Sequence, residues 1–578
     1  MKFSKLIKKP KSYFRVKPNL ADYNKTYNSF NYKKHYKEIG WFGNKKLNAA
    51  YNAITKHTLT ERKNKVALYW EGAEGEKKEF SFQEMDLLSN KFANILKKYK
   101  VRRGDRIFLF LPRVPELYIA FIGILKTGAI AGTLFSAFQS KALEDRLKDS
   151  GAKIIVTNKE LRKRIYQVKK NLPGLKNLII IDDKKKAKNE IDYTDEMQAA
   201  SEEFNIVKTS PEDIAFMLYT SGTTGKPKGV IHAHLACLHE HMTAKYVLDI
   251  HDNDTFWCTA DPGWVTGIAY EILGTWSLGA SSLVYAGRFN PEKWYSLLEK
   301  YKVNVWYTAP TAIRMLMREG NKIIKKYNLK SLRHLCSVGE PLNPEAVKFS
   351  LKVFNRPFHD NYWQTETGGM VIANYPCMPI KPGSMGKPVP GIKAAIIDDQ
   401  GRQLPPKKEG SLVIKPGWPS MMRGIWKNKK KYNSYFSKGW YLTGDKAFKD
   451  KDGYFWFIGR ADDVIKTSGE RVGPFEVESA LVEHPAIVEA GVIGKPDKLR
   501  GEIIKAFITL KQNHKPSEAL KQNIQKFVKK RLAGHAYPRE IEFRKNLPKT
   551  RSGKIVRRVL KAQELGQAIG DTSTLETF

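Results

Sequence analysis

The stretch Tyr219-Thr-Ser-Gly-Thr-Thr-Gly-Lys-Pro-Lys-Gly-Val230 packs three glycines, four Ser or Thr hydroxyls and two lysines into twelve residues. An apolar run, Ile214 to Leu218, comes directly before it and predicts a buried strand that ends in a donor-rich loop. Glycines let backbone N–H groups approach an anion, and hydroxyl and ammonium groups add donors. The alternative is a plain surface turn, but such turns rarely carry so many donors. The stretch therefore predicts a polyphosphate-binding loop.

The loop is not a Walker A motif. That pattern needs a glycine where this chain has Thr220, and Ser or Thr where it has Pro227. The loop resembles instead the phosphate-binding signature of the acyl-adenylate-forming superfamily, which includes acyl-CoA synthetases, peptide-synthetase adenylation domains and luciferases. The resemblance implies that the phosphates of ATP are held by Thr220, Ser221, Gly222, Thr223, Thr224, Gly225 and Lys226.

Length and cysteine usage set the broad class. At 578 residues the chain is too long for one ordinary core, so at least two domains are expected. Its four cysteines are scattered with no CxxC pair, which argues against a disulfide framework or a cysteine zinc site. No apolar run approaches the roughly 20 residues of a membrane helix, and the basic N-terminus lacks an apolar signal core. These features predict a cytoplasmic protein.

The formal net charge is +41, from 100 Lys and Arg against 59 Asp and Glu. Such an excess is typical of proteins that bind nucleic acids or anionic membranes. The lysines, however, are spread along the whole chain, and no recognisable nucleic-acid module or stacking-aromatic signature accompanies them. We interpret most of them as solvated surface lysines that also attract anionic substrates; a basic nucleic-acid-binding protein is the alternative from another class.

Helix and strand patterns alternate along much of the chain. A capping box opens a helix at Ser81–Glu84, Arg106–Leu111 reads as a short buried strand, and Pro115–Lys126 reads as a helix. Such alternation predicts an α/β fold with parallel sheets covered by helices. Residues Ile380–Phe457 favour a smaller β-rich subdomain. We expect a helical extension at 1–60, an adenylation domain at 61–459, and a small mobile α+β domain at 460–578.

Asp360-Asn-Tyr-Trp-Gln-Thr-Glu-Thr-Gly-Gly369 is a second motif. Its aromatics offer a stacking face for a purine, and Glu366 is a hard oxygen ligand suited to the Mg²⁺ of MgATP. Taken alone, a capped loop with a satisfied carboxylate explains it as well. The motif closely resembles the superfamily pattern, with the residues that acetyl-CoA synthetases have there. The resemblance implies this nucleotide-binding set: Gly339, Glu340, Pro341, Asp360, Asn361, Tyr362, Trp363, Gln364, Thr365, Asp445, Arg460 and Arg471.

A third motif, Leu547-Pro-Lys-Thr-Arg-Ser-Gly-Lys-Ile555, presents Lys554 near the end of the chain. An ammonium suits an anionic acyl-phosphate transition state, where charge stabilisation dominates. Any single lysine among so many is usually a surface residue, but the flanking residues resemble the catalytic-lysine loop of the superfamily. The resemblance makes Lys554 the catalytic residue, Asp462 the hinge, and Val482, His484 and Ile487 a further metal site.

Two further stretches, Asp261–Gly267 and Tyr307–Arg314, resemble acetyl-CoA synthetases, and the residues of Ser468–Glu478 and His535–Phe543 resemble the shorter Bacillus-type branch of these enzymes. Residue-by-residue matching implies an acyl pocket of Val265, Thr266, Val338 and Trp363, in which the indole leaves room for little beyond a methyl group. It also implies coenzyme A contacts from Thr266, Ser468, Gly469 and Lys529. Two positions depart from the main bacterial pattern: Glu470 replaces a histidine, and Lys529 replaces an arginine and so loses its bidentate fork.

The resemblance implies an acetate–CoA ligase that joins acetate, MgATP and coenzyme A through an acetyl-adenylate. A propionyl- or medium-chain acyl-CoA synthetase is the nearest alternative, since a pocket that excludes methylenes discriminates weakly. A stand-alone adenylation protein that feeds a carrier protein is another. Related synthetases are switched off by acetylation of the catalytic lysine, so an acetyltransferase and a deacetylase acting on Lys554 are expected partners.

Overall fold

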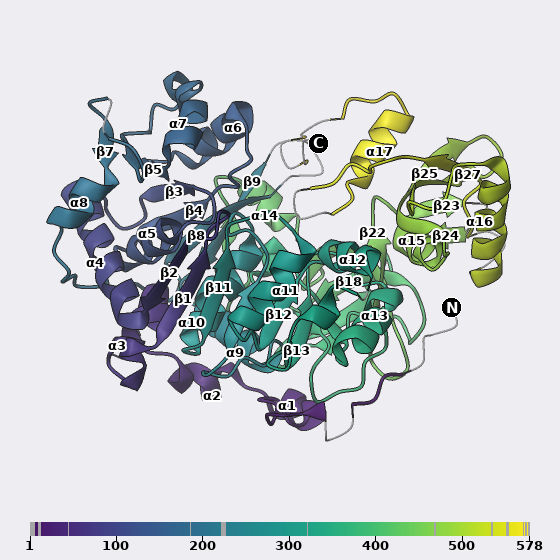
Figure 1. Ribbon diagram of the computed structural model, residues 1–578, viewed down its shortest axis with the longest axis horizontal. Coiled ribbons are helices and arrows are strands. Elements are labelled where there is room, and N and C mark those ends of the chain that lie inside the picture. Colours follow the sequence, from purple (N-terminus) through teal and green to yellow (C-terminus); the bar gives the residue numbers. More distant parts are fainter. Residues whose placement is uncertain are drawn as a thin grey trace.

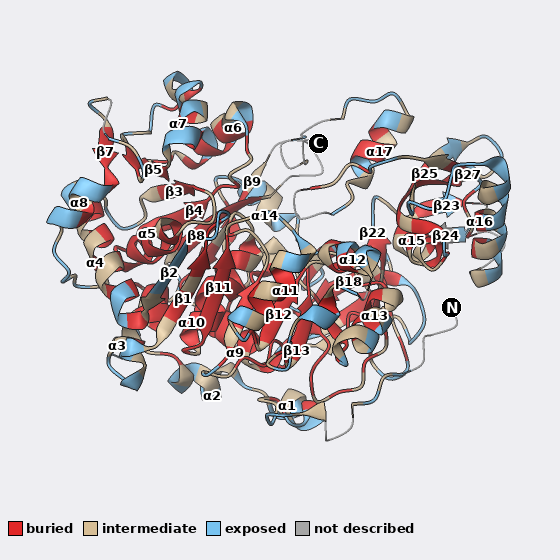
Figure 2. Ribbon diagram, viewed as in Figure 1, coloured by how far each residue is buried: buried red, intermediate tan, exposed pale blue. Residues whose placement is uncertain are grey.

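The computed structural model describes residues 6–9, 13–43, 45–184, 187–220, 227–320, 322–467, 470–532, 536–550, 554–569, 572 and 575, and only the backbone of Arg471. Figure 1 shows a large body built on two extended sheets, with a smaller C-terminal module standing beside it. The central strands of the large sheets are buried, whereas the edge strand β2 (Lys77–Ser81) and the outer helices expose residues to water (Figure 2). In the described part of the chain, no helix is long and apolar enough to cross a membrane.

The first sheet has eight strands in the order β19-β9-β8-β4-β3-β5-β6-β7. Six of them are mutually parallel: β3 (Arg106–Phe110), β4 (Ile130–Thr133), β5 (Ile154–Thr157), β6 (Asn177–Ile180), β7 (Glu190–Asp192) and β8 (Ile214–Thr220). Strand β9 (Lys228–Ala233) pairs antiparallel with β8, and β19 (Gly424–Ile425) pairs antiparallel with β9 at the edge of the sheet. The predicted phosphate loop therefore joins β8 to its antiparallel neighbour β9.

Helices cover this sheet: α4 (Phe82–Lys98), α5 (Pro115–Lys126), α6 (Ser140–Ser150), α7 (Lys159–Tyr166), α8 (Tyr193–Ala199) and α14 (Lys429–Asn433). The predicted capping box is present: Ser81 accepts from the backbone N–H of Glu84, and the Glu84 carboxylate accepts from the backbone N–H of Ser81. Helix α5 spans the predicted residues, because a proline starts it and a Thr-Gly pair follows its last turn.

The second sheet has nine strands in the order β16-β15-β14-β13-β12-β10-β11-β1-β2. They are β1 (Val66–Glu71), β2 (Lys77–Ser81), β10 (Thr255–Cys258), β11 (Ser281–Tyr285), β12 (Val305–Thr308), β13 (His334–Ser337), β14 (Phe358–Tyr362), β15 (Ile372–Ala373) and β16 (Lys387–Pro388). The central run from β1 to β14 is parallel, so the carboxyl ends of β12, β13 and β14 meet at one edge.

The two faces of this sheet pack on different helices. Trp306 and Leu335 belong to the core under α11 (Pro291–Lys300), α12 (Pro310–Glu319) and α13 (Pro344–Phe354). The next residue on each strand, Tyr307 and Cys336, belongs to the core on the opposite face, with α9 (Ala236–Tyr246), α10 (Thr275–Ser277) and the π-helical turn Gly267–Gly274. This alternation follows from the two-residue period of a strand.

The predicted β-rich region forms a five-stranded antiparallel sheet: β17 (Ala394–Ile397), β18 (Gly410–Ile414), β20 (Phe436–Ser437), β21 (Trp440–Lys449) and β22 (Phe455–Arg460). Strands β21 and β22 pair Asp445 directly with Arg460. This sheet stands between the large body and the C-terminal module, so its last strand leads straight into the predicted hinge.

The C-terminal module has its own sheet and hydrophobic core. Its elements are β23 (Ile465–Thr467), β24 (Glu470–Val472), β25 (Ile487–Asp497), β26 (Gly501–Leu510), β27 (Glu540–Phe543), α15 (Pro474–Val482), α16 (Glu518–Arg531) and α17 (Arg557–Glu564). Strands β25 and β26 are long, and they pair with each other over almost their whole length. Their tip carries Leu499, which is 89% exposed.

In its described residues, the N-terminal segment forms short helices, including α1 (Tyr23–Ser29), α2 (Tyr32–His35) and α3 (Lys56–Thr58). It is tied to the large body, since the Lys9 ammonium bonds with the His359 ring and the Tyr375 carbonyl. The α/β class with parallel sheets, a β-rich subdomain and a small α+β C-terminal module is confirmed. The residue limits of the three predicted domains stay a prediction.

Candidate nucleotide and acyl site

The Asp360–Gly369 motif and the Gly339-Glu340-Pro341 turn meet at the carboxyl edge of the nine-stranded sheet. Strand β13 ends at Ser337, just before the Gly339 turn, and the neighbouring β14 ends at Tyr362, just before Trp363. The parallel register pairs Ser337 with Asp360, so the two motifs lie side by side. In open α/β sheets, ligands bind in the crevice outside the carboxyl ends of the strands. This edge is therefore the candidate site.

Asp445 is held in this crevice by three side chains. The Tyr362 hydroxyl donates to its Oδ2 at 2.5 Å and the Gln364 amide donates to the same oxygen at 2.9 Å. The Arg460 guanidinium lies 3.4 Å from its other oxygen, Oδ1. Burial raises the pKa of the Asp445 carboxyl, an effect that Arg460 opposes. The arrangement fixes the plane of the carboxylate and leaves Oδ1 without a hydrogen bond.

Unpaired buried atoms mark where a ligand fits. Among the described residues, these polar atoms near the edge are buried without a hydrogen-bond partner: Asp360 Oδ1, Asn361 Nδ2, Asp445 Oδ1 and Ser337 Oγ. Buried polar groups are normally hydrogen-bonded, because an unmade bond is costly. Burial also raises the pKa of Asp360 well above its usual range. A polar ligand at this edge would satisfy groups that the chain leaves unpaired.

Glu366 lies on the short 3₁₀ turn Thr365–Thr367, close to the end of the phosphate motif. The Tyr435 hydroxyl donates to its carboxylate at 2.9 Å, and the Lys228 ammonium donates to that hydroxyl at 3.2 Å. No group of three His, Cys, Asp or Glu side chains in the described part of the chain forms a metal cage. One carboxylate beside the phosphates suits the way Mg²⁺ binds, through one or two carboxylates and the phosphates of a nucleotide.

Glu340 in the Gly-Glu-Pro turn is already bound by the large body. The Thr311 hydroxyl donates to its Oε1 at 2.7 Å, and Arg314 donates to its Oε2 at 2.9 Å. Both partners come from α12 and lie in a stretch that the sequence assigned to the acid. The Glu340 side chain therefore fixes the turn, and a nucleotide contact there would come from the backbone.

The predicted acyl-pocket residues lie around the same edge. Val265 and Val338 are buried in the core that contains Tyr270 and Tyr307, and Trp363 packs against it. Thr266 directly precedes the π-helical turn Gly267–Gly274. The structure thus brings three separate segments together, and it adds two tyrosines that the sequence reasoning did not select. Tyr307 begins the Tyr307–Arg314 stretch, but the contact of either tyrosine with Trp363 has no local sequence signal, because it depends on packing between distant segments.

Lys554 stands before α17 and faces the crevice. Its backbone N–H donates to Thr550 Oγ1 at 3.1 Å. The Lys554 side chain is exposed to water but has protein on several sides. Desolvation by these protein groups lowers the pKa of the ammonium below that of an ordinary lysine. Glu340 and Asp445 raise that pKa, whereas Arg460 and Arg557 lower it further. These four charges place the ammonium within electrostatic reach of the nucleotide motifs.

Other predicted residues lie apart from this crevice. Asp462 is exposed between β22 and β23, where the large body joins the module. Lys529 lies on α16, at the outer edge of the module in Figure 1, and its ammonium stands 5.5 Å from the centre of the Tyr537 ring. Both ring nitrogens of His484 are engaged, one with Asn523 and one with the N–H of Ala486.

Several predicted contacts cannot be located. Ser221, Gly222, Thr223, Thr224, Gly225 and Lys226 lie outside the described residues, as do Ser468, Gly469 and the side chain of Arg471. Of the phosphate loop, Thr220 is described at the end of β8, and its hydroxyl is one of the unpaired buried atoms. The phosphate and coenzyme A contacts of this group stay predictions.

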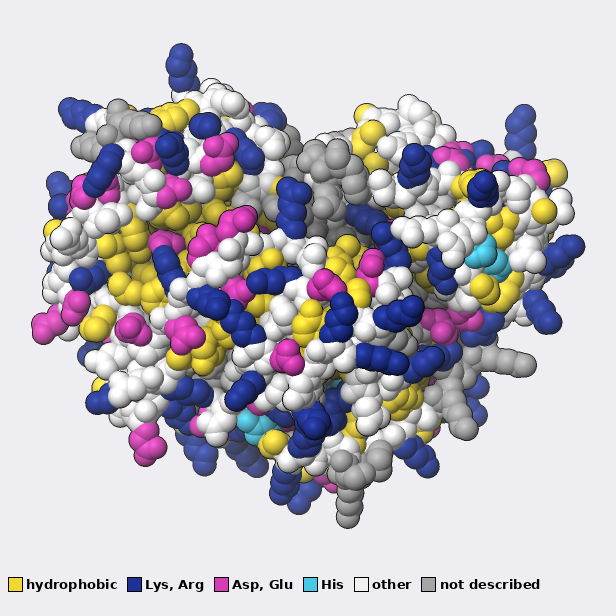
Figure 3. Space-filling view, in the orientation of Figure 1, with side chains coloured by type: hydrophobic (Ala, Val, Ile, Leu, Met, Phe, Trp, Pro, Cys, Tyr) yellow, Lys and Arg dark blue, Asp and Glu magenta, His cyan; other side chains and the backbone are white. Residues whose placement is uncertain are grey.

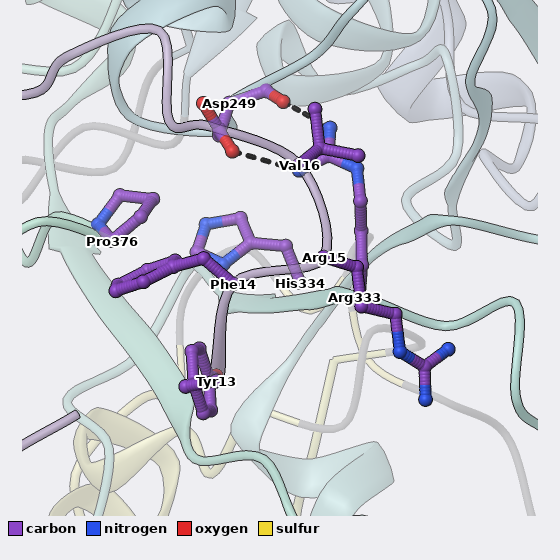
Figure 4. A pocket seen from close by; sticks show the side chains of 8 residues that line it. All are labelled: Tyr13, Phe14, Arg15, Val16, Asp249, Arg333, His334 and Pro376. Carbon is purple, nitrogen blue, oxygen red and sulfur yellow. Dashed lines mark hydrogen bonds and ion pairs between the residues drawn. The ribbon is translucent and has the colours of Figure 1, made fainter. Parts of the chain in front are cut away.

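Two cavities lie away from the crevice. The one in Figure 4 is enclosed by the N-terminal segment Tyr13–Val16 and by Asp249, Arg333, His334 and Pro376, and its volume of about 10 Å³ leaves room for one water at most. It lies at the amino end of β13, opposite the motif edge. The other, of about 180 Å³, adjoins the hinge and is lined in part by Lys446 and Lys466.

Comparison with known proteins agrees with this geometry. The AMP-binding enzyme family matches residues 55–426, and the AMP-binding enzyme C-terminal domain matches residues 476–554. The chain is 54% identical to an acetyl-coenzyme A synthetase of Bacillus subtilis, with 96% of this chain and 98% of that protein covered. It is 44% identical to an acetyl-coenzyme A synthetase of Methanothrix thermoacetophila, over 93% of this chain and 86% of that one.

Solved structures of two acyl-CoA ligases are also similar to this chain along most of its length. A Brucella canis acyl-CoA synthetase superposes with a TM-score of 0.75 at 35% identity, covering 95% of this chain and 99% of its own. The anthranilate CoA ligase AuaEII, solved with anthranoyl-AMP, superposes with a TM-score of 0.82 at 31% identity, covering 90% and 98%. With two family matches on separate parts of the chain and close relatives along nearly all of it, this chain belongs to the AMP-binding enzyme family.

Proposed function

We infer that this protein is an AMP-forming acetate–CoA ligase, which converts acetate, ATP and coenzyme A to acetyl-CoA, AMP and pyrophosphate. The observation that carries this inference is the 54% identity to an acetyl-coenzyme A synthetase over 96% of the chain. The geometry agrees, because the nucleotide and acyl motifs converge at one sheet edge that is lined with unpaired polar groups.

In the first half-reaction, a carboxylate oxygen of acetate forms a bond to the α-phosphorus of ATP, and the bond to pyrophosphate breaks. Asp445 accepts hydrogen bonds from ribose hydroxyls, since its free Oδ1 lies in the crevice. Lys554 neutralises charge that develops on the phosphoryl group. Its electrostatic coupling to Glu340 and Asp445 supports this role.

Glu366 is the residue that would hold the magnesium ion of MgATP, with Tyr435 orienting its carboxylate. The bound ion would neutralise phosphate charge. The chain's own part is to present an oriented carboxylate beside the β8–β9 loop, which supplies backbone donors and lysines to the β- and γ-phosphates.

In the second half-reaction, the thiol sulfur of coenzyme A attacks the acyl carbonyl carbon, and the bond from that carbon to the AMP oxygen breaks. We propose that the C-terminal module rotates about Asp462 to bring Ser468, Gly469 and Lys529 to coenzyme A. The outer position of Lys529 supports this proposal, because that residue can reach the crevice only if the module turns.

Trp363 selects the acid in this proposal. A propionyl- or medium-chain acyl-CoA synthetase is the runner-up, and acid profiling separates the two. The test measures AMP release with ATP, coenzyme A and carboxylic acids from acetate to octanoate. Acetate should give the highest kcat/KM, with weaker activity on propionate; a maximum at a longer acid would overturn the assignment. Trp363→Gly should move the maximum towards longer acids.

A basic nucleic-acid-binding protein remains the alternative of another class. Figure 3 shows Lys and Arg scattered over the visible face and interspersed with Asp and Glu, rather than gathered in one patch. Scattered charge gives general attraction of anions such as ATP and coenzyme A, not a track for a nucleic-acid backbone. Retention on heparin without acetate-dependent AMP release would favour the alternative.

Regulation and location complete the proposal. The exposed Lys554 is open to acetylation, which would remove its charge and stop adenylation. Mass spectrometry that finds acetyl-Lys554 in fully active protein would contradict this. We assign the reaction to the cytoplasm, where ATP and coenzyme A are available and thiols stay reduced; all four cysteines are free.

A further inference from the structure

A chain of buried hydrogen bonds runs behind Trp363. The indole Nε1–H donates to the Tyr307 hydroxyl at 3.3 Å, and that hydroxyl donates to Asn361 Oδ1 at 2.8 Å. Tyr307 on β12 is 0% exposed and Asn361 on β14 is 4% exposed, so water does not compete for these bonds. Burial raises the pKa of the Tyr307 phenol well above its ordinary value, so the hydroxyl keeps the proton that it donates.

Aromatic packing holds the same indole from a second side. The Tyr270 ring meets Trp363 edge to face, with ring centres 5.2 Å apart and an interplanar angle of 88°, and it meets Tyr307 at 6.0 Å and 88°. Tyr270 is itself fixed, because its hydroxyl accepts from the backbone N–H of Met370 and bonds with Thr243, each at 2.8 Å. The packing restricts sliding of the indole, and the hydrogen bond fixes its rotation.

We propose that Tyr307 is a positioning residue for acid length: its hydroxyl fixes the rotation of Trp363 and so sets the depth of the acyl pocket. The proposal rests on the proposed function and on Trp363 as the pocket wall. One methylene in an apolar pocket changes kcat/KM by about 10- to 200-fold. A small rotation of the wall is therefore enough to alter the preference between acetate and propionate.

The Tyr307 hydroxyl also links the acyl-pocket residue Trp363 to the nucleotide motif. Because Tyr307 donates to Asn361, the acyl wall shares an anchor with the motif that is predicted to meet the nucleotide. Asn361 has an unpaired Nδ2 at this edge. A ligand that binds this amide would hold the Asn361 side chain and, through Tyr307, the indole. Acid preference is thus expected to depend on Asn361 as well.

The test compares two buried tyrosines. In Tyr307→Phe, the ratio of kcat/KM for propionate to that for acetate should rise by about five- to tenfold, the factor that one lost buried hydrogen bond carries. Tyr295→Phe is the matched control, because Tyr295 is also buried and its hydroxyl bonds to no described residue. Its ratio should equal that of the wild type.

A double-mutant cycle separates positioning from general damage. Phenylalanine at position 363 has no N–H to donate, so Tyr307→Phe should leave the ratio unchanged in a Trp363→Phe background. An unchanged ratio in Tyr307→Phe itself, or an equal rise in both backgrounds, would overturn the proposal. If Tyr307→Phe does not fold, Asn361→Ala replaces it: removal of the acceptor should raise the ratio, and an unchanged ratio would overturn the proposal.

Measurements on the wild-type protein separate a failure of this proposal from a failure of the function on which it rests. Wild-type protein that releases no AMP with acetate contradicts the proposed function. Wild-type protein that prefers acetate, together with a Tyr307→Phe variant of unchanged preference, contradicts only the role of Tyr307.

Discussion

The nucleotide motif on the large body and the Lys554 segment on the C-terminal module are held in opposite ways. Asp445 takes hydrogen bonds from Tyr362 and Gln364, and Gln364 is itself held by Tyr441. The Lys554 ammonium, by contrast, makes no hydrogen bond to any other described residue and is coupled to the site through charge alone. One region is a preorganised cradle, and the other is a charge that the proposed rotation of the module would bring in and withdraw.

The boundary between the two regions is correspondingly thin. Asn343 follows β13 and leaves its helix α13 uncapped, while its side-chain amide donates to Ser479 on α15 at 2.8 Å. Within the described chain, this is the single side-chain hydrogen bond between the large body and the module beyond residue 463. A weak contact of this kind suits a module that alternates between two positions.

The largest effect is expected when the Lys554 ammonium is removed. Lys554→Ala should slow acetate-dependent ATP–pyrophosphate exchange by about 100- to 1,000-fold, the usual effect of losing one group that stabilises transition-state charge. Thioesterification of supplied acetyl-AMP should be nearly unchanged. Lys561→Ala, an exposed lysine of the same module, is the control. Equal loss of both half-reactions would contradict the assigned role.

A change in the cradle should affect binding. Asp445→Asn keeps the shape of the side chain but weakens its bonds to ribose, so the KM for ATP should rise by about 10- to 100-fold, as expected for hydrogen bonds to a charged group. Steady-state kinetics at saturating acetate measures this change. Asp452→Asn, which alters an ion pair with Lys381 at the surface, should leave the KM unchanged.

The lowered pKa of Lys554 predicts different pH profiles for the two half-reactions. The ammonium is lost as pH rises through a pKa below the ordinary lysine value, so adenylation should fall by about tenfold per pH unit above that point. Thioesterification of supplied acetyl-AMP should not show this limb. Lys554→Arg keeps its charge and should flatten the limb; a limb that persists in this variant would assign the titration to another group.

The smallest effect is expected at the boundary. Ser479→Ala removes the bond from Asn343 and should slow adenylation by about two- to tenfold, the net contribution of one ordinary hydrogen bond. Asn343→Ala should have a similar effect, and the double variant should be no slower than either single one. Fully additive losses would show that the two residues act separately.

Local patterns predicted much of the fold. Helix α5 has the predicted bounds, because a proline start and a Thr-Gly end are signals carried within a few residues. The length of β25 and β26 could not be predicted from local pattern, since their outer residues are not apolar and join the sheet only by pairing with each other. Strand pairing depends on the partner and is not written in one segment.

For the candidate site, the chemical groups could be predicted and their supports could not. The motifs supplied Asp445, Glu366 and Trp363, each within a characteristic run of residues. The pairing of these three residues with the hydroxyls of Tyr362, Tyr435 and Tyr307 could not be predicted, because the members of each pair are 56 to 83 positions apart. A hydroxyl leaves no periodic or compositional signal, so only its place in the fold reveals its partner.

The sequence by itself determined the class of reaction, because a donor-rich glycine loop and a lysine loop carry their chemistry in contiguous residues. It also determined the alternation of helices and strands, which depends on local apolar periodicity. Which of the functional side chains are held by hydrogen bonds, and which are not, depends on the tertiary structure. The register of β13 on β14 brings two motifs together, and burial decides that Tyr307 holds Trp363 while Lys554 stays in contact with water. Register and burial are properties of the packed chain, since they arise from contacts between residues far apart in sequence.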